Sequence, residues 1–150
     1  MRNLALIVLS VLTSACGTAK GPPFSPAQPP GDDQALIYIY APPSDVPALA
    51  SFGYDCGLAL DNQQIGRLQP HGYTHIYLQP GRHDVDSWLG AYTYPPLRIT
   101  DRFEAGQTYY YRFEVTGNPR MLQWAIRQVS SQQARREIVE YRHQPNTYKQ

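Results

Sequence analysis

The chain of 150 residues lacks most of the features that reveal a protein's chemistry. It has two cysteines and two methionines, and charged residues make up only 17% of it. Lys and Arg total 13 and Asp and Glu 12, so there is no basic excess with which to bind nucleic acid. A nucleophile elbow, a phosphate-binding loop, a dinucleotide fingerprint and a metalloprotease helix are all missing from the sequence. These absences predict a protein that is not an enzyme, uses no cofactor and does not bind nucleic acid.

The sequence also lacks an apolar run long enough to cross a bilayer. Its N-terminal run, Leu4 to Leu12, is interrupted by Ser10 and has about half of the roughly 20 residues that a spanning helix needs. Arg2 precedes the run and small residues follow it, which is the pattern of a secretory signal. We therefore expect residues 1–15 to be a signal peptide that is removed.

The stretch "LTSAC", Leu12 to Cys16, resembles the bacterial lipoprotein signal. The resemblance implies cleavage between Ala15 and Cys16 and attachment of fatty acyl chains such as palmitate to Cys16, which anchors the protein to a membrane. Lipoproteins with aspartate after the cysteine are retained in the inner membrane, and Gly17 stands there instead, so resemblance to this sorting rule implies the outer membrane. We expect the domain to face the periplasm. The alternative is an ordinary secretory signal that a cysteine follows by chance. If Cys16 is acylated, Cys56 is either a buried strand thiol or a reactive thiol that can form an intermolecular disulfide.

Residues 16–34 are predicted to be the lipidated cysteine and a flexible tether. Gly17 to Asp33 contains five prolines and three glycines, and Phe24 is its only large apolar side chain. Such a segment does not build a core of its own. At roughly 3.1 Å per residue, an extended tether would hold the folded domain up to about 50 Å from the bilayer.

Residues 35–143 are predicted to form one all-β domain, an antiparallel β-sandwich of about seven to eight short strands. "ALIYIYAP", Ala35 to Pro42, is the first of several short runs rich in β-branched and aromatic residues and separated by turn signals. The end of the chain departs from this pattern, because Ser130 and Gln133 are spaced as a capping box before a series of helix formers. We expect a C-terminal α-helix from about residue 130, followed by a flexible tail over residues 144–150.

A β-hairpin is predicted over "HGYTHIYLQPGRHDVDSW", residues 71–88, which holds three of the four histidines. Pro80 and Gly81 fit the centre of a type II turn, proline by its fixed φ and glycine by its tolerance of positive φ. In that register Leu78 faces His83 on the apolar side of the hairpin. His83 is therefore expected to be a partly buried imidazole bonded to backbone, with a structural role.

The same register separates the histidines from one another. His75 lies on the face opposite to His83 and faces Asp86, so the two rings do not converge on one ion. A zinc site needs three or four converging ligands. We expect no metal site, and we expect His75 and Asp86 to form an exposed charge pair worth less than about 1 kcal/mol.

Tyrosine is the residue that the sequence has in excess, with 12 in the chain beside two tryptophans. In "TYYYRF" the strand period of two places Tyr110 on the face opposite to Tyr109 and Tyr111, so some rings point outward. Outward rings offer rigid area with a polar tip for contact with proteins or sugars; alternatively, they pack along a wet sheet face with their hydroxyls in water. The candidate interaction surface consists of His75, Tyr77, Asp86 and Tyr110.

Three motifs resemble an uncharacterised family of bacterial envelope lipoproteins, known only as a domain of unknown function. They are "D-x-x-x-x-G-x-L" from Asp61, "L-x-P-G-x-H" from Leu78 and "A-G-x-x-Y-Y" from Ala105. The resemblance extends from about Leu36 to the final helix, and it implies a small β-sandwich and an envelope location with no catalytic residues. Ala41 departs from the family pattern, which has arginine after the opening strand.

These patterns together predict a non-enzymatic outer-membrane lipoprotein. Its β-sandwich is expected to be a protein-interaction module with an envelope protein of unknown identity as partner. The alternative is a domain that binds glycan, peptidoglycan or a small apolar ligand through exposed tyrosines. A flat exposed aromatic patch would favour protein contact, and a concave aromatic groove would favour ligand binding.

Overall fold

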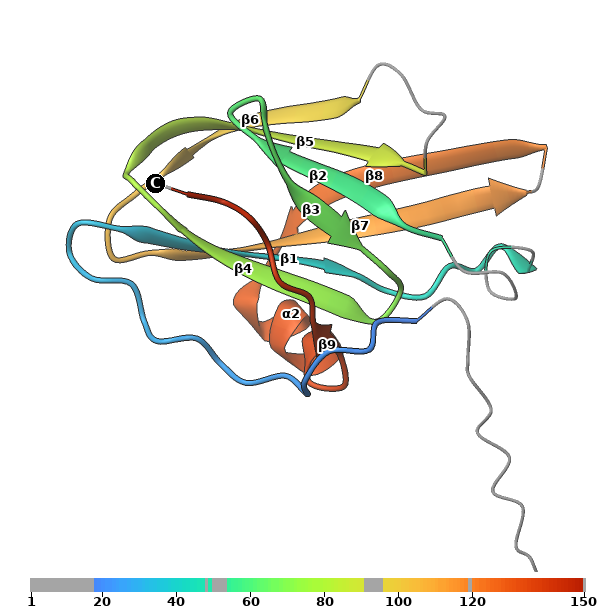
Figure 1. Ribbon diagram of the computed structural model, residues 1–150, viewed down its shortest axis with the longest axis horizontal. Coiled ribbons are helices and arrows are strands. Elements are labelled where there is room, and N and C mark those ends of the chain that lie inside the picture. Colours follow the sequence, from blue (N-terminus) through green and yellow to red (C-terminus); the bar gives the residue numbers. More distant parts are fainter. Residues whose placement is uncertain (1–17, 48, 50–53, 91–95, 119, 150) are drawn as a thin grey trace, which may run out of the picture.

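The computed structural model describes residues 18–47, 49, 54–90, 96–118 and 120–149. Two β-sheets stack face to face, and a C-terminal helix lies against the outer side of one of them (Figure 1). The predicted all-β sandwich with one C-terminal helix is therefore confirmed. The elements are β1 (Ala35–Ala41), β2 (Cys56–Leu60), β3 (Gln63–Leu68), β4 (Gly72–Leu78), β5 (Gly81–Leu89), β6 (Leu97–Phe103), β7 (Thr108–Asn118), β8 (Met121–Val129), α2 (Ser131–Ile138) and β9 (Arg142–His143).

The two sheets differ in size and in strand direction. Sheet A has the order β8-β7-β1-β4-β9, and sheet B has the order β3-β2-β5-β6. Sheet B is antiparallel throughout, whereas in sheet A β1 runs parallel to β7 and β4 runs parallel to β9. The sandwich was predicted to be antiparallel, but sheet A contains both parallel and antiparallel pairs. β1 and β7 are far apart in the chain, and both strands start at the same end of the sheet, so they pair in parallel.

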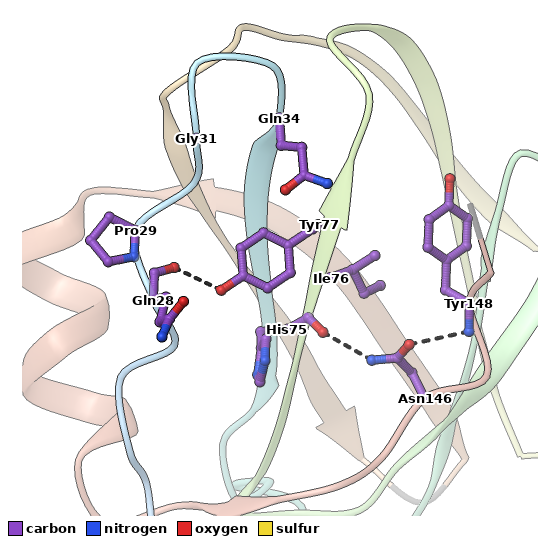
Figure 2. A pocket seen from close by; sticks show the side chains of 9 residues that line it. All are labelled: Gln28, Pro29, Gly31, Gln34, His75, Ile76, Tyr77, Asn146 and Tyr148. Atoms are coloured by element: carbon purple, nitrogen blue, oxygen red, sulfur yellow. Dashed lines mark hydrogen bonds between the residues drawn. The ribbon is translucent and has the colours of Figure 1, made fainter.

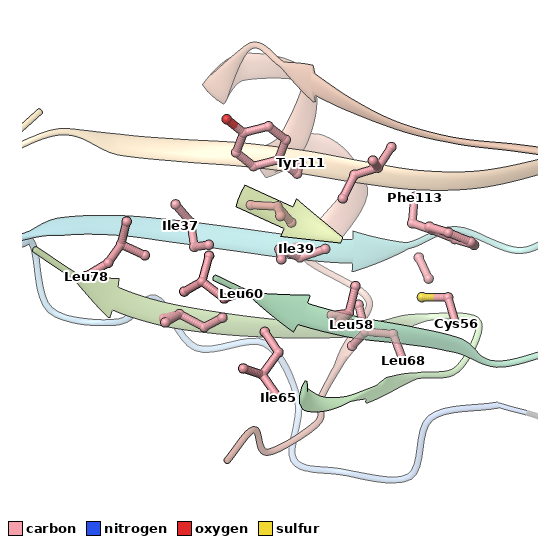
Figure 3. Packing of buried hydrophobic residues seen from close by; sticks show 14 of the residues in the cluster. Ile37, Ile39, Cys56, Leu58, Leu60, Ile65, Leu68, Leu78, Tyr111 and Phe113 are labelled. Atoms are coloured by element: carbon pink, nitrogen blue, oxygen red, sulfur yellow. The ribbon is translucent and has the colours of Figure 1, made fainter. Parts of the chain in front are cut away.

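The core between the sheets follows from the strand period of two. On β1, Ile37 and Ile39 point toward sheet B, where Leu58 and Leu60 of β2 meet them (Figure 3). All four side chains are at most 1% exposed. Cys56 belongs to the same core as a free thiol, and burial raises its pKa to about 12. Of the two readings of Cys56, the structure supports the buried strand thiol.

The predicted hairpin over residues 71–88 is wrong. β4 pairs with β1 in sheet A, where His75 lies opposite Tyr38, whereas β5 pairs with β2 and β6 in sheet B. Pro80 and Gly81 therefore carry the chain from one sheet to the other, and Gly81 has a φ of 151°, which a residue with a side chain rarely adopts. A Pro-Gly pair signals a sharp change of direction, which a sheet crossover needs as much as a hairpin does.

Helix α2 forms where the capping pattern places it. The Ser130 hydroxyl accepts a hydrogen bond from the Gln133 backbone N–H at 3.2 Å, and Ala134 and Ile138 are fully buried against sheet A. Glu137 fastens the helix to the sheet, because it accepts hydrogen bonds from the Tyr40 hydroxyl at 2.9 Å and from Arg112 Nε at 3.0 Å. Partial burial alone would raise the Glu137 pKa, but these bonds and one from Gln133 hold it below the ordinary value.

The segment predicted as a free tether is bound to the domain over much of its length. Ala19–Gly31, called the strap below, crosses the outer side of sheet A (Figure 1). Its Phe24 ring lies 5.1 Å from the Tyr73 ring, and the Ser25 N–H donates to the Tyr73 hydroxyl at 3.2 Å. The tether prediction is wrong here because it counted only apolar residues inside the segment, and the segment packs on tyrosines that other parts of the chain supply.

The predicted flexible tail is likewise bound. Gln144–Tyr148, called the tail below, runs between the edges of the two sheets: the Gln144 N–H donates to the Tyr73 carbonyl at 2.7 Å, and the Thr147 N–H donates to the Ile65 carbonyl at 2.9 Å. The tail thereby closes the sandwich between β4 and β3. Pro145 made this segment a poor helix or strand, but it left the flanking N–H groups able to pair.

The signal and anchor predictions concern Ala15 and Cys16, which lie outside the described residues. Among the described helices, none has the length and apolar character needed to cross a membrane.

Candidate functional site

The four residues of the predicted interaction surface do not form one surface. Asp86 is 4% exposed and belongs to sheet B, where Arg98 binds both its carboxylate oxygens at 2.7 and 2.8 Å. Tyr110 is 6% exposed and stacks on Tyr38 at 5.1 Å in sheet A. The predicted His75–Asp86 pair is therefore wrong, since the two residues belong to different sheets. Only His75 and Tyr77, neighbours on β4, remain together at a partly exposed site.

His83 is also placed differently from the prediction, although its contacts agree with a fastening role. Its Nε2 hydrogen bonds to the Gln79 carbonyl at 2.8 Å, the backbone contact that was expected. Its Nδ1 lies 2.6 Å from Asp61 Oδ2 in the turn between β2 and β3. Asp61 Oδ1 in turn accepts from the Asp84 N–H at 3.0 Å, so the cluster ties that turn to β5.

The outward tyrosines of sheet A lie beneath the strap. The Tyr38 hydroxyl accepts a hydrogen bond from the Ala27 N–H at 2.8 Å, and the Tyr77 hydroxyl donates to the Gln28 carbonyl at 2.7 Å. Burial raises the pKa of Tyr38, which keeps its phenol protonated. The strap therefore covers Tyr38, which is 3% exposed, whereas Tyr77 stays partly exposed beside the strap.

A groove of about 660 Å³ lies where the strap, β4 and the tail meet (Figure 2). Tyr77 projects from β4 toward the strap, and Tyr148 stands on the tail at the other side. Amide side chains add donors and acceptors to these rings. The described lining residues are Gln28, Pro29, Gly31, Gln34, His75, Ile76, Tyr77, Asn146 and Tyr148.

Asn146 fixes the tail side of the groove. Its Nδ2 donates to Thr74 Oγ1 and to the His75 carbonyl, both at 2.9 Å, and its Oδ1 accepts from the Tyr148 N–H at 3.2 Å. One side chain therefore joins β4 to the backbone of Tyr148 and holds that ring beside the groove (Figure 2). A second cavity of about 470 Å³ lies on the opposite side of the strap, with Phe24 and Tyr110 in its wall.

His75 forms the floor of the groove as a neutral ring. Its pKa is lowered by burial and by the nearby His143, whose ring centre is 5.2 Å away. Its Nδ1 is buried and has no hydrogen-bond partner among the described residues. The ring also lies against Tyr38 and Tyr77, at 5.8 and 6.1 Å between ring centres.

The groove thus combines ring faces, amides and an imidazole without a charged group among its described lining residues. Such a lining suits a neutral polar ligand held by hydrogen bonds and ring contacts. Sequence reasoning missed Gln28, Asn146 and Tyr148, which were assigned to a tether and a frayed tail. The one signal in the strap was Phe24, and the one in the tail was Tyr148 itself, because a large ring in an otherwise polar segment needs a surface to cover it.

Comparison with known proteins gives a family and no function. The model of a family described as "Protein of unknown function (DUF2846)" matches residues 31–123. No curated protein and no solved structure matches the chain. The matched span contains β1 to β7 and ends in β8, so it supplies the β4 side of the groove but neither the strap before Gly31 nor the tail.

Proposed function

Because the chain belongs to the DUF2846 family, whose function is unknown, we propose a role for it from its groove: a non-enzymatic envelope lipoprotein whose β-sandwich binds a neutral glycan segment. The lipid on Cys16 anchors the protein to the outer membrane, and the domain faces the periplasm. The groove between strap, β4 and tail holds the ligand. Peptidoglycan glycan strands are the first candidate, since they are the polar polymer that a periplasmic domain meets.

The observation that carries this proposal is the concave arrangement of rings and amides around His75. Asn146 holds the backbone of Tyr148, and the bond to the Gln28 carbonyl holds the Tyr77 hydroxyl, so the chain positions both residues before a ligand arrives. Fixed side chains reduce the entropy lost on binding. A sugar ring has an apolar face for a tyrosine and hydroxyl groups for amides, which matches both kinds of lining group.

Protein contact is the second candidate, and it rests on a different observation. β8 is an edge strand of sheet A in the described sheet order, with only β7 beside it. Met121, at its start, is 66% exposed. An edge strand can accept a further strand from a partner. The surface that the sequence predicted for protein contact does not support this candidate, however, since two of its four residues, Tyr110 and Asp86, are buried.

The groove proposal is tested by titrating the purified protein with soluble glycan fragments released from peptidoglycan and by sedimenting it with intact sacculi. We expect saturable binding that Tyr148→Ala weakens about tenfold, equivalent to about 1.4 kcal/mol. Lys149→Ala is the matched control, because Lys149 is the exposed residue directly after the tail and does not line the groove. Absence of binding, or equal loss in both variants, contradicts the proposal. Reproducible crosslinking of β8 in intact cells to one envelope protein would favour protein contact.

The anchor is tested separately with Cys16→Ser. The variant should leave the membrane fraction and lose incorporation of labelled fatty acid. Unchanged partitioning with no acyl chain on the parent protein contradicts the anchor and leaves the groove proposal standing.

A further inference from the structure

The strap is fixed to the domain from its first residues. The Ala19 N–H donates to the Pro70 carbonyl at 3.0 Å, and Ala19 is 8% exposed. The His143 N–H donates to the Pro22 carbonyl at 2.8 Å, and Pro23 forms a bridge with Arg142. The point at which the chain leaves the domain toward Cys16 is therefore set by the β3–β4 turn and by β9.

The length of chain left between this point and the proposed lipid is short. Cys16 lies two residues before Thr18, the first described residue. Two residues span at most about 7 Å even when fully extended. If Cys16 carries acyl chains, as proposed above, the bilayer surface lies within a residue or two of the start of the strap, and not at the end of a long tether.

The side of the domain next to this point is positively charged. We define the anchor face as Lys20, Arg136, Val139 and Arg142, all exposed on the strap, on α2 and on β9. None of its three cations forms a salt bridge with a described carboxylate. Val139, at the end of α2, is an apolar side chain that is 58% exposed.

Arg136 and Val139 lie three residues apart on α2 and so share a face, and the Pro23–Arg142 bridge brings the start of the strap, with Lys20, against β9. The Arg142 N–H donates to the His71 carbonyl at 2.8 Å, next to the Pro70 carbonyl that receives Ala19, and the Tyr141 N–H donates to the Ile138 carbonyl at 2.9 Å. Glu140 is the exposed carboxylate of this stretch, so the cations outnumber the acids. On the outer side of sheet B, Arg67 and Arg98 are paired with aspartates, but Arg82 and Arg102 form no salt bridge with a described carboxylate. What distinguishes the anchor face is therefore its position beside the start of the strap.

We propose that the anchor face rests on the headgroups of acidic phospholipids, so that the domain is held at the membrane with α2 and the start of the strap toward the bilayer. This rests on the proposed acylation of Cys16. A negatively charged leaflet attracts Lys and Arg within about a Debye length of its surface. The anchor supplies that proximity, and Val139 supplies an apolar contact at the interface.

The orientation leaves the groove accessible. The strap begins beside the start of β4, at Pro70, whereas Tyr77 lies at the other end of that strand. Seven strand residues span about 20 Å. The Tyr77 side of the groove therefore lies about a strand length from the headgroups, where a glycan in the periplasmic space can reach it.

The test places the full acylated protein in vesicles of phosphatidylethanolamine and phosphatidylglycerol that contain a gadolinium-labelled headgroup lipid. A fluorinated probe is attached in turn through Val139→Cys on the anchor face and Arg102→Cys on the outer side of sheet B. The buried Cys56 is shielded from the probe. We expect relaxation of the fluorine signal to be several-fold faster at position 139 than at position 102, and we expect the difference to shrink when phosphatidylcholine replaces both lipids.

The outcomes separate the two proposals. Mass spectrometry of the same sample shows whether Cys16 is acylated; an unmodified cysteine overturns the anchor and the orientation together. Acylated protein with equal relaxation at both positions overturns the orientation alone. A difference that does not depend on phosphatidylglycerol overturns the role of the cations. Tyr38→Phe combined with Tyr73→Phe, which removes two fastenings of the strap, should reduce the relaxation at position 139 while the melting temperature confirms a folded domain.

Discussion

The two cores of the molecule are built from different side chains. Between the sheets, the described part of the chain forms an inner core of nineteen buried residues, of which two are tyrosines, Tyr54 and Tyr111. On the outer side of sheet A, eight buried residues among those that the structure describes form an outer core, and five of them are tyrosines. Those five are Tyr38, Tyr40, Tyr73, Tyr110 and Tyr141.

The difference reflects what covers each core. Strands cover the inner core from both sides, and their backbone groups are paired within the sheets, so aliphatic side chains suffice. The strap covers part of the outer core, and its five prolines and extended backbone give it no hydrogen bonds of its own. Tyr38 and Tyr73 accept from strap N–H groups and Tyr77 donates to a strap carbonyl. A tyrosine surface is thus what allows an irregular segment to be bound.

The largest effect is expected in the inner core. Phe113→Ala removes a fully buried ring from β7 and should lower the free energy of unfolding by about 3–5 kcal/mol, because the lost burial and the cavity both count. Urea unfolding followed by tryptophan fluorescence measures it. Met121→Ala is the control on the same hairpin, since that side chain is 66% exposed, and it should change stability little. Equal losses in both variants would contradict the inner core as the main source of stability.

A smaller and more local effect is expected in the outer core. Phe24→Ala removes the ring that packs on Tyr38 and Tyr73, and it should cost about 1–2 kcal/mol, since the ring is only partly buried. Amide hydrogen exchange should rise in Ala19–Gly31 and leave Ile37 and Ile39 of β1 protected. Pro26→Ala, at an exposed strap position, is the control. If exchange rises equally in β1, the two cores unfold as one unit and the distinction between them fails.

The same distinction explains which parts of the molecule the sequence predicts. The alternation of β1 and the Ser130 cap are local patterns, and the sandwich and its helix follow from them. The strap and the tail are bound through partners that lie far away in the chain, as the Asn146 contact with Thr74 shows, and composition within a segment carries no information about such partners. The candidate site is the part of the molecule that the sequence predicts least well, because two of its three walls come from the strap and the tail.

The crossover at Pro80 and Gly81 was unpredictable for a different reason. A tight turn between two strands fixes the change of direction, but not the sheet to which the second strand returns. That choice depends on β2, which pairs with β5 through Ala59 and Asp86. Asp86 could then be buried only because Arg98 on β6 supplies a bidentate partner, and this pairing is visible only once the sheet order is known.

The smallest expected effect is a pH dependence that belongs to the outer core alone. In the folded state the His75 pKa lies below its ordinary value of 6.5, mainly because the ring is buried and to a lesser extent because His143 lies nearby. In the unfolded chain the His75 pKa has its ordinary value. The unfolded state therefore binds more protons between the two values, so this contribution to stability is full above about pH 6.5 and is lost as the pH falls through the folded pKa. Tyr38, Tyr77 and His143 are the titratable groups that face the ring, and burial raises the pKa of the Tyr38 phenol, so it carries no charge in this range. His75→Phe keeps a ring among them and should flatten the dependence of melting temperature on pH below 6.5. A slope that stays the same in this variant would mean that acid acts on the molecule elsewhere, and the outer core would then have no separate response to pH.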